Sequence, residues 1–227
     1  MAKEPTIGQK AMVEAFGTFL LTFIGAGAVI ATYALSPAYP ALLIIAVANG
    51  IALALAVTVA MNISGGHINP AVTIGALFAG KISKPDAAVY IVSQLVGAFI
   101  GGAFLLALYP AAAGAAVHYG TPGLGQSTGV VNGILFEALM TFFLVFVVFA
   151  TAIDRRAVKV GGFAIGLTVM LDVLVGGPFT GAAMNPARAI GPTIASMYFA
   201  NWYVYWIGPI LGAIVAALIY KYLILKD

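Results

Sequence analysis

Cysteine is absent from the 227 residues, and charged side chains make up only 7% of them. The lack of cysteine excludes disulfides, thiol catalysis and cysteine-ligated metals. Soluble domains carry about 25% charged residues, so this chain has too little charge to solvate a globular surface. With 63% hydrophobic residues and a mean hydropathy of +1.09, it is expected to be an integral membrane protein. Its basic residues are scattered at segment ends, which argues against nucleic acid as a partner.

Six apolar stretches are long enough to cross a bilayer, since a span needs about 20 mostly apolar residues. They cover 11–34, 41–61, 87–108, 131–153, 161–176 and 202–225, and the fifth is expected to run on for a few residues. Two shorter apolar pieces, 69–79 and 185–196, each begin at an Asn-Pro-Ala triplet and cannot cross alone. We therefore predict an all-α membrane protein with six transmembrane helices and two re-entrant half-helices.

The distribution of basic residues predicts the orientation. With six spans, nine of them fall on one side: Lys3, Lys10, Lys81, Lys84, Arg155, Arg156, Lys159, Lys221 and Lys226. The loops on the other side, around 35–40, 109–130 and 177–201, hold a single basic residue, Arg188. Positive charge collects on cytoplasmic loops, so both termini are expected to be cytoplasmic in a multi-pass protein of the cell membrane.

The chain repeats itself in an inverted sense. "EAFGTFLLTF" at 14–23 matches "EALMTFFLVF" at 137–146, and "SGGHINPAVTIG" at 64–75 matches "TGAAMNPARAIG" at 180–191. "YIVSQLVGA" at 90–98 matches "YWIGPILGA" at 205–213. Because each half holds three crossings, the second must enter the membrane upside down. A single membrane domain over 1–227 is thus expected, with one repeat at about 1–110, another at about 131–227, and an extracellular loop at about 111–130 between them.

Each Asn-Pro-Ala triplet predicts the start of a helix. Proline is tolerated in the first turn, where its missing N–H would be unpaired anyway, and asparagine is a good N-cap. A half-helix of about 10–12 residues rises roughly 15–18 Å, about half of the hydrocarbon core. Two of them entering from opposite faces would meet near the midplane. The residues at this meeting point are Asn69, Pro70, Ala71, Asn185, Pro186 and Ala187.

The meeting point predicts a passage for neutral molecules. Each helix N-terminus carries about half a positive charge, so the facing pair opposes cations, including hydrated protons. The amides of Asn69 and Asn185 can donate to a passing water, while the glycine-rich approaches, 62–68 and 178–184, supply backbone carbonyls. Arg188, one turn along the second half-helix, would repel cations at the pore mouth. Intramembrane charges usually face the bundle interior or water, which favours this role over snorkelling to the interface.

These residues resemble the aquaporin (major intrinsic protein) family over essentially the whole chain, and the archaeal aquaporin M type most closely. The specific signature is the pair of triplets with "NPAR", inside a repeat with paired "E-A-x-x-T-F". The resemblance implies a passive channel for water rather than an enzyme, without a cofactor, and a homotetramer with one pore in each subunit. It also places the selectivity filter at Asn49, Val173, Ala182 and Arg188.

The filter markers conflict within this resemblance. Strict water channels usually have a large aromatic residue where Asn49 stands and a histidine where Val173 stands. Glycerol-type members usually have aspartate where Ala189 stands. We expect conduction of water together with small neutral solutes such as glycerol.

Four further polar residues have two possible roles each. Glu14 and Glu137 hold equivalent places in the repeat and could relay protons, but the resemblance favours carboxylates that accept backbone N–H groups and hold the half-helix loops. His67 is a pore-lining candidate or a hydrogen-bonded structural histidine. Asp172 could attract cations, although a bond to the outer loop is the favoured interpretation.

Three rival functions remain to be weighed. A secondary transporter is the main alternative, because inverted repeats with broken helices are also carrier architecture. It would normally need a coupling site, such as paired acids deep in the bundle, whereas Glu14 and Glu137 occur one per half and near span ends. An ion channel would need a ring of charge, and an enzyme a nucleophile–base pair, metal cluster or phosphate loop; the sequence shows none of these.

Overall fold

The computed structural model describes residues 4–35, 41–158 and 160–225. Six helices in this part of the chain are long and apolar enough to span a membrane. They are α1 (Ile7–Leu35), α2 (Leu42–Ala60), α4 (Lys84–Leu108), α6 (Val130–Val148) continued by η2 (Phe149–Ile153), α7 (Gly161–Thr180), and α9 (Val204–Ile219) continued by η3 (Tyr220–Leu225). Among these described residues no strand is found, so the predicted all-α membrane fold with six spans is confirmed.

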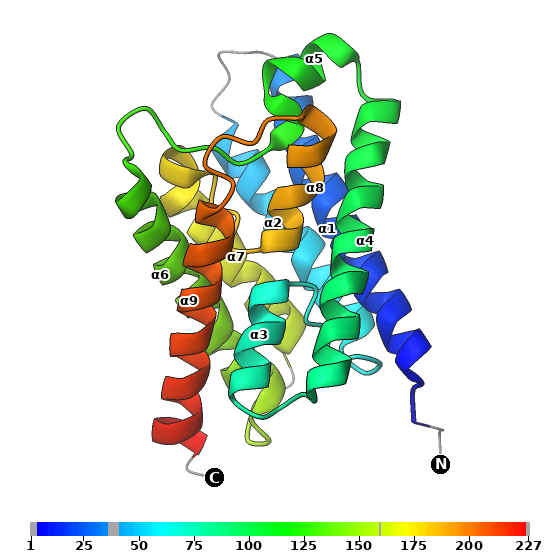
Figure 1. Cartoon of the computed structure of the whole chain (residues 1–227), viewed down its shortest axis with the longest axis vertical. Coiled ribbons are helices and arrows are strands. Elements are labelled where there is room, and N and C mark those ends of the chain that lie inside the picture. Colours follow the sequence, from blue (N-terminus) through cyan, green and yellow to red (C-terminus); the bar gives the residue numbers. More distant parts are fainter. Residues whose placement is uncertain (1–3, 36–40, 159, 226–227) are drawn as a thin grey trace.

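Two short helices begin at the Asn-Pro-Ala triplets. α3 (Pro70–Phe78) has 9 residues and α8 (Pro186–Ser196) has 11, which at 1.5 Å per residue gives about 14 and 17 Å. Figure 1 shows α8 in the upper half of the molecule and α3 in the lower half, with their first residues toward the middle. The predicted pair of re-entrant half-helices is therefore present.

The helix α7 runs further than the sequence indicated. The approach to the second triplet was expected to begin at 178, but α7 continues through Pro178 to Thr180. It ends at Gly181, whose φ of +80° is a left-handed cap and whose N–H bonds to the carbonyl of Gly177 at 2.9 Å. Glycine allows this conformation without a Cβ clash. The irregular approach is consequently only 181–184.

The packing of the helices follows the inverted repeat. α1 packs against α4 as α6 packs against α9, and α2 packs against α7, its counterpart in the other half. The half-helices are exchanged, because α3 lies against α9 and α8 lies against α4. Each half therefore seats the short helix of the other half, which holds the two triplets together at the centre.

Glycines allow the closest helix contacts. A Cβ on Gly97 of α4 would overlap the carbonyl oxygen of Ala15 in α1, and a Cβ on Gly212 of α9 would overlap that of Ala138 in α6. The two contacts are equivalent in the repeat. Within a bilayer such small residues drive helix association, since backbones can approach and pack without a hydrophobic driving force.

Replacement of Gly97 by alanine is expected to lower the unfolding temperature by several degrees. The added methyl must displace the α1 backbone, and overpacking of this kind costs about 1–3 kcal/mol. Thermal unfolding of the purified protein in detergent measures the effect. Gly129→Ala is the matched control, because nothing lies within 4 Å of a Cβ at Gly129; equal losses in the two variants would contradict the packing role.

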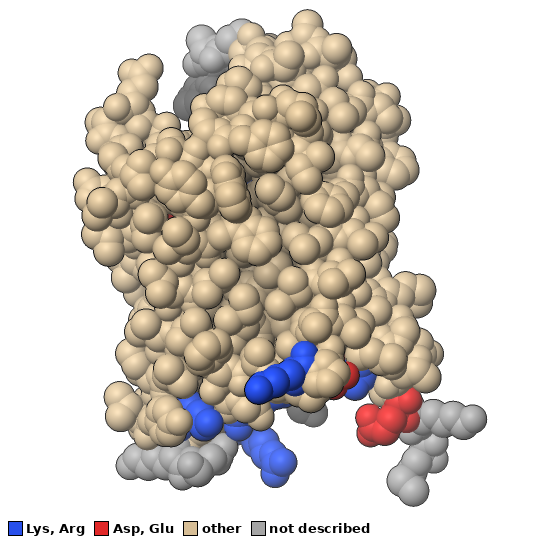
Figure 2. Space-filling model, viewed as in Figure 1, with Lys and Arg blue, Asp and Glu red and all other residues tan. Residues whose placement is uncertain are grey.

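Charged side chains gather at one end of the molecule. Figure 2 shows the lysines and arginines of this view at the end where both termini lie, while the rest of that face is uncharged. Lys3, Lys159 and Lys226 lie outside the described residues. This distribution agrees with the charge pattern used to predict the orientation, which itself stays a prediction.

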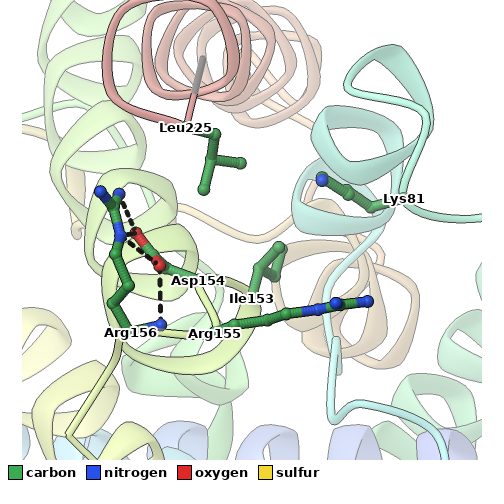
Figure 3. A pocket seen from close by; sticks show the side chains of 6 residues that line it. All are labelled: Lys81, Ile153, Asp154, Arg155, Arg156 and Leu225. Carbon is green, nitrogen blue, oxygen red and sulfur yellow. Dashed lines mark hydrogen bonds and ion pairs between the residues drawn. The ribbon is translucent and has the colours of Figure 1, made fainter. Parts of the chain in front are cut away.

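Asp154 fixes the connection between α6 and α7 at this end. Its carboxylate accepts three hydrogen bonds from the Arg156 guanidinium (Figure 3), from Nε at 2.9 Å to Oδ1 and 3.3 Å to Oδ2 and from Nη2 at 2.7 Å to Oδ2. Oδ1 also accepts the Arg156 backbone N–H at 2.9 Å. The Tyr220 hydroxyl donates to Oδ2 at 3.0 Å. Asp154 therefore ties the loop to the end of α9, and these bonds, chiefly those from Arg156, hold its pKa well below the ordinary value of 3.8.

The lowered pKa of Asp154 predicts a pH dependence of stability. Because the folded state favours the carboxylate, the stabilisation is fully present above the ordinary pKa and is lost as the pH falls below about 4. Asp154→Asn should therefore be less stable than the unmodified chain at neutral pH, and the gap should narrow in acid. Unfolding temperatures of both proteins between pH 7 and pH 3 test this; a gap that widens on acidification would contradict it.

Candidate functional site

The two asparagines cap their half-helices in the same way. Oδ1 of Asn69 accepts the N–H of Ala71 at 2.8 Å. Oδ1 of Asn185 accepts the N–H of Ala187 at 3.0 Å and that of Arg188 at 3.1 Å. Both asparagines have extended backbone, as an N-cap requires. The prolines that follow occupy the first helical position, where no N–H is needed.

The same asparagines bind each other's loops. Nδ2 of Asn69 donates to the carbonyl of Met184 at 2.8 Å, and Nδ2 of Asn185 donates to the carbonyl of Ile68 at 2.9 Å. These reciprocal bonds bring the N-termini of α3 and α8 together in the protein interior, where Asn69 and Asn185 are both buried. An amide nitrogen carries two hydrogens, and in the described residues each Nδ2 has one hydrogen-bond partner.

The backbone before each triplet is held in a rarely used conformation. Ile68 has a φ of +57° and Met184 a φ of +51°, and Ala182 lies in the same region at +47°. Residues other than glycine adopt left-handed backbone at a cost of about 1–3 kcal/mol each. Such conformations persist only where neighbouring bonds fix them, and two buried carboxylates supply those bonds.

Glu14 of α1 holds the first approach. Its Oε1 accepts the His67 N–H at 2.9 Å and the Ser64 hydroxyl at 2.6 Å, and its Oε2 accepts the Ile68 N–H at 2.6 Å. The Gln94 amide adds a fourth bond to Oε2 at 2.7 Å. Glu14 is fully buried, and every one of these bonds ends on the loop or on α4. This geometry fits a loop-holding carboxylate.

Glu137 of α6 holds the second approach in the equivalent way. Oε1 accepts the Thr180 hydroxyl at 2.7 Å and the Ala183 N–H at 3.0 Å, while Oε2 accepts the Met184 N–H at 2.7 Å. The glutamine that contacts Glu14 has no counterpart here, because proline stands at the repeated position, 209. The two carboxylates therefore hold the same two backbone N–H groups in each half and differ in their outer partners.

Two tyrosines complete these networks, and sequence reasoning missed both. The Tyr90 hydroxyl donates to the carbonyl of Ser64, and the Tyr205 hydroxyl donates to the carbonyl of Thr180, each at 2.8 Å. Both residues begin the third repeated motif, "YIVSQLVGA" and "YWIGPILGA". A tyrosine kept in both copies of a membrane helix was the signal, since a buried hydroxyl needs a polar partner.

Arg188 is fixed by the outer loop. Its guanidinium donates to the carbonyl of Gly120 at 3.2 Å, and the side chain is buried. Gly120 ends the short helix η1 (His118–Gly120), which follows α5 (Ala111–Ala116). The His118 ring stacks on Tyr198 with centroids 3.9 Å apart, and the hydroxyls of Thr121 and Ser196 lie 3.0 Å apart. The sequence predicted only a loop here. The segment packs against α8, and its contact with Arg188 fixes the direction of that side chain.

The structure brings part of the predicted filter together. Val173 and Arg188 line a cavity of about 190 Å³ on the α8 side of the crossed asparagines, and Gly181, the neighbour of Ala182, lines it too. Asn49 is directed elsewhere: its Nδ2 donates to the carbonyls of Ile45 at 2.8 Å and Gly25 at 3.5 Å. Its amide is thus held against the α1 and α2 backbones, and it does not line this cavity.

Of the remaining candidates, His67 lies in the first approach and Asp172 in α7. The His67 ring contacts the Thr73 hydroxyl at 3.1 Å through Nδ1 and meets Tyr90 edge-on at 5.2 Å. These contacts fit a hydrogen-bonded structural histidine, and the pore-lining role stays a prediction. Asp172 is buried with Oδ2 unpartnered in the described residues, so the expected bond to the outer loop is not observed.

The assembled site has fixed dipoles. The N-termini of α3 and α8 meet at its centre, each asparagine amide has one hydrogen-bond partner among the described residues, and Arg188 lines the cavity beyond. A model of the family described as "Major intrinsic protein" matches residues 1–220. The chain belongs to this family.

Two plant proteins whose names describe them as aquaporins are similar to this major intrinsic protein. It is 40% identical to "Probable aquaporin TIP3-2" of Arabidopsis thaliana, with 100% of this chain and 87% of that protein aligned. "Aquaporin TIP1-2" of Zea mays is 42% identical over 95% of this chain and 86% of its own length. The predicted family is therefore confirmed.

A solved structure shares the fold. The aquaglyceroporin from Plasmodium falciparum superposes with a TM-score of 0.86 at 23% sequence identity, covering 97% of this chain and 98% of the other. At this identity the likeness establishes the architecture and leaves solute choice to the residues of each pore. The narrower likeness of this major intrinsic protein to the archaeal aquaporin M type stays a prediction.

Proposed function

We propose that this chain is a passive channel for water that also admits small neutral solutes such as glycerol and excludes protons and ions. Membership of the major intrinsic protein family and the aquaporin relatives support the passive channel over a secondary transporter. The single observation that carries the proposal is the reciprocal pair of bonds from Asn69 and Asn185. These bonds hold the two asparagine amides and the N-termini of α3 and α8 close together.

Exclusion of protons follows from the position of the two asparagine amides and the two helix ends. A water molecule between the asparagines accepts a hydrogen from each amide, so its own hydrogens turn away toward its neighbours on both sides. A hydrogen-bonded chain through the pore then changes direction here, which interrupts proton hopping. The two half-positive helix ends raise the energy of any cation at the same place. The energy of a water molecule, which has no net charge, changes little at this place.

Backbone acceptors line the approaches. Among the described residues, no hydrogen bond is accepted by the carbonyls of 65–67 or 181–183. These six groups remain to accept from permeating molecules, in a pore whose wall is otherwise mostly apolar. A water or a polyol can exchange one carbonyl for the next, whereas an ion finds too few ligands to replace its hydration shell.

The outer cavity supports a mixed solute range. Arg188 supplies charge and donors there, while Val173 and the glycines beside it supply little bulk and no polarity. With the Asn49 amide bonded to α1 and α2, no second polar side chain narrows the filter from that helix. A wide, partly apolar filter lets a glycerol carbon backbone pass with its hydroxyls on the arginine side.

Stopped-flow light scattering on proteoliposomes tests this function. Vesicles with protein should shrink at least about tenfold faster than empty ones in an impermeant osmolyte and should re-swell in glycerol, with no added proton flux. A flux that saturates and follows a proton or sodium gradient would favour the carrier. Shrinkage at the rate of empty vesicles would overturn the proposal.

Assembly and placement are parts of the same proposal. We propose a homotetramer in the cell membrane with both termini cytoplasmic, repeats at about 1–110 and 131–227, and an extracellular loop at about 111–130. The distribution of basic residues supports the orientation, and the repeated motifs support the two halves. Light scattering after gel filtration measures the number of subunits. Protease access to a tag at either end of the chain in intact cells measures the orientation, and a tag confined to an internal membrane would contradict the location.

A further inference from the structure

The short helix η1, whose last carbonyl binds Arg188, has an unusual backbone. Its three residues, His118, Tyr119 and Gly120, have φ values of +46°, +51° and +74°. Glycine adopts this left-handed conformation freely, but the other two residues adopt it at an energetic cost. Such a conformation persists only where surrounding contacts fix it. The contacts that fix η1 therefore also fix the Gly120 carbonyl on which the arginine depends.

One face of η1 packs against the helix bundle. Tyr119 is buried in an apolar cluster with Ala26, Ile30 and Leu105. Gly120 lies so close to α1 that a Cβ there would overlap the backbone of Ala26. The other side of η1 packs against α8, and there the contacts are polar and aromatic.

One hydroxyl joins the end of η1 to the end of α8. Ser196 Oγ donates to the carbonyl of Thr193 at 3.3 Å, which uses its single hydrogen. The Thr121 hydroxyl, 3.0 Å from the same oxygen, is then the donor in their contact. The N–H of Tyr198 donates to that oxygen as well, at 3.2 Å. Ser196 therefore accepts from the residue that follows η1 and from the segment that follows α8.

Two stacked rings form the second contact with the end of α8. The rings of His118 and Tyr198 have centroids 3.9 Å apart and planes that differ by 7°. His118 is exposed, and among the described residues its imidazole takes part in no hydrogen bond. Tyr198 directly follows Met197, which ends α8 in left-handed backbone with a φ of +53°. The stack thus joins two turns whose backbone is strained.

We propose that His118 and Tyr198 are positioning residues for Arg188. Their ring stack holds η1 in the conformation in which the Gly120 carbonyl accepts from the guanidinium at 3.2 Å. Stacked aromatic pairs stabilise a contact beyond the area that they bury. This inference rests on the proposed function, because its consequence is a change in the solutes that pass.

The consequence follows from the lining of the outer cavity. Gly120, Thr121 and Arg188 all line it. If η1 relaxes, one wall of the cavity moves and the guanidinium loses the acceptor that directs it. The filter then becomes wider on average, and it discriminates less between water and a larger neutral solute such as glycerol.

Hydrogen exchange of the purified protein tests the ring stack without any measurement of transport. The N–H of Thr121 bonds to the carbonyl of His118 at 3.0 Å, so it exchanges slowly only while η1 is closed. H118A and Y198A should each speed its exchange by about threefold or more. Y198F keeps the ring and loses only a hydroxyl that has no hydrogen bond among the described residues. Its exchange should match that of the unmodified chain.

H118N separates the ring from the backbone preference. Asparagine and histidine are both enriched in left-handed backbone, but asparagine has no ring to stack. Exchange in H118N should therefore be as fast as in H118A, while H118F, which restores a ring, should bring it back toward the normal rate. Normal exchange in H118N would show that backbone preference holds η1, and it would overturn the proposal.

Permeability in proteoliposomes tests the connection to the filter. H118A should raise the ratio of glycerol to water permeability by about threefold, which is less than the effect of removing the arginine. Because His118 acts through Arg188, the double variant H118A/R188A should have the same ratio as R188A. An equal rise from H118A with and without the arginine would contradict a positioning role. Unfolding temperatures of the variants control for folding.

The outcomes keep this inference apart from the proposed function. If the unmodified chain conducted no water, the channel function would fail, and the exchange rates would still decide whether the rings hold η1. If the unmodified chain conducted water but H118A and Y198A left both the exchange rate and the permeability ratio unchanged, the positioning role would fail and the channel function would stand. A change in Y198F as large as in Y198A would assign the effect to the hydroxyl and overturn the role of the stack.

Discussion

Replacing Glu137 by alanine is expected to reduce osmotic water flux to the level of empty vesicles. The change removes the acceptor for the Thr180 hydroxyl and for the N–H groups of Ala183 and Met184. Each buried donor left without a partner costs about 1–3 kcal/mol, and no water from a bilayer core can replace the lost bonds. The left-handed residues of this approach then relax, and Met184 no longer presents its carbonyl to Asn69.

The measurement is water permeability per folded protein in proteoliposomes, with gel filtration to count the folded fraction. Glu137→Gln keeps one acceptor oxygen and should give an intermediate flux. Glu4→Ala, which removes an exposed carboxylate near the start of the chain, should leave flux and folding unchanged. If Glu137→Ala kept more than half of the normal flux, the carboxylate would not be what holds the loop.

Replacing Arg188 by alanine should raise glycerol permeability by about tenfold and open a measurable leak of protons or cations, while water flux changes by less than about twofold. Arg188 is the only charged residue among those that line the outer cavity. Its removal takes away the electrostatic barrier at that level and widens the passage by a long side chain. The crossed asparagines stay in place, so water still passes in single file.

Arg188→Lys separates charge from shape in this experiment. Lysine keeps the positive charge but cannot reproduce the planar donor set that meets the Gly120 carbonyl. Cation exclusion should survive in Arg188→Lys, and glycerol permeability should rise only modestly. Similar leaks in the alanine and lysine variants would show that geometry, not charge, sets the barrier.

The parts of the fold that the sequence predicted are those with a local cause. About twenty apolar residues make a span, and Asn followed by Pro favours a helix start, so the six spans and both half-helices could be placed within a few residues. The inverted repeat added the relative direction of the halves. Even the end of α7 had a local signal, because Gly181 is a typical left-handed cap.

The parts that could not be predicted depend on contacts far apart in the chain. Nothing near Asn185 indicates that its amide binds the carbonyl of Ile68, 117 residues away. The Gly120 carbonyl that aims Arg188 belongs to a segment with no recognisable pattern. Position 49 aligns with a filter residue by counting, yet the direction of its side chain depends on Gly25 of another helix. The spacing of residues along a helix predicts the depth of a side chain in the membrane. The packing of neighbouring helices determines the direction in which that side chain points.

The exchange of half-helices has a consequence for how the channel is made. During synthesis α3 leaves the ribosome long before α9, the helix against which it packs, while α8 finds α4 already inserted. The helix α3 therefore lacks α9, and its N-terminus lacks the partner loop of α8, until translation is almost complete. A chain cut after the first repeat would contain α3 and its contacts with α4 but neither α9 nor the amide of Asn185, so we expect such a half to leave the end of its short helix unburied.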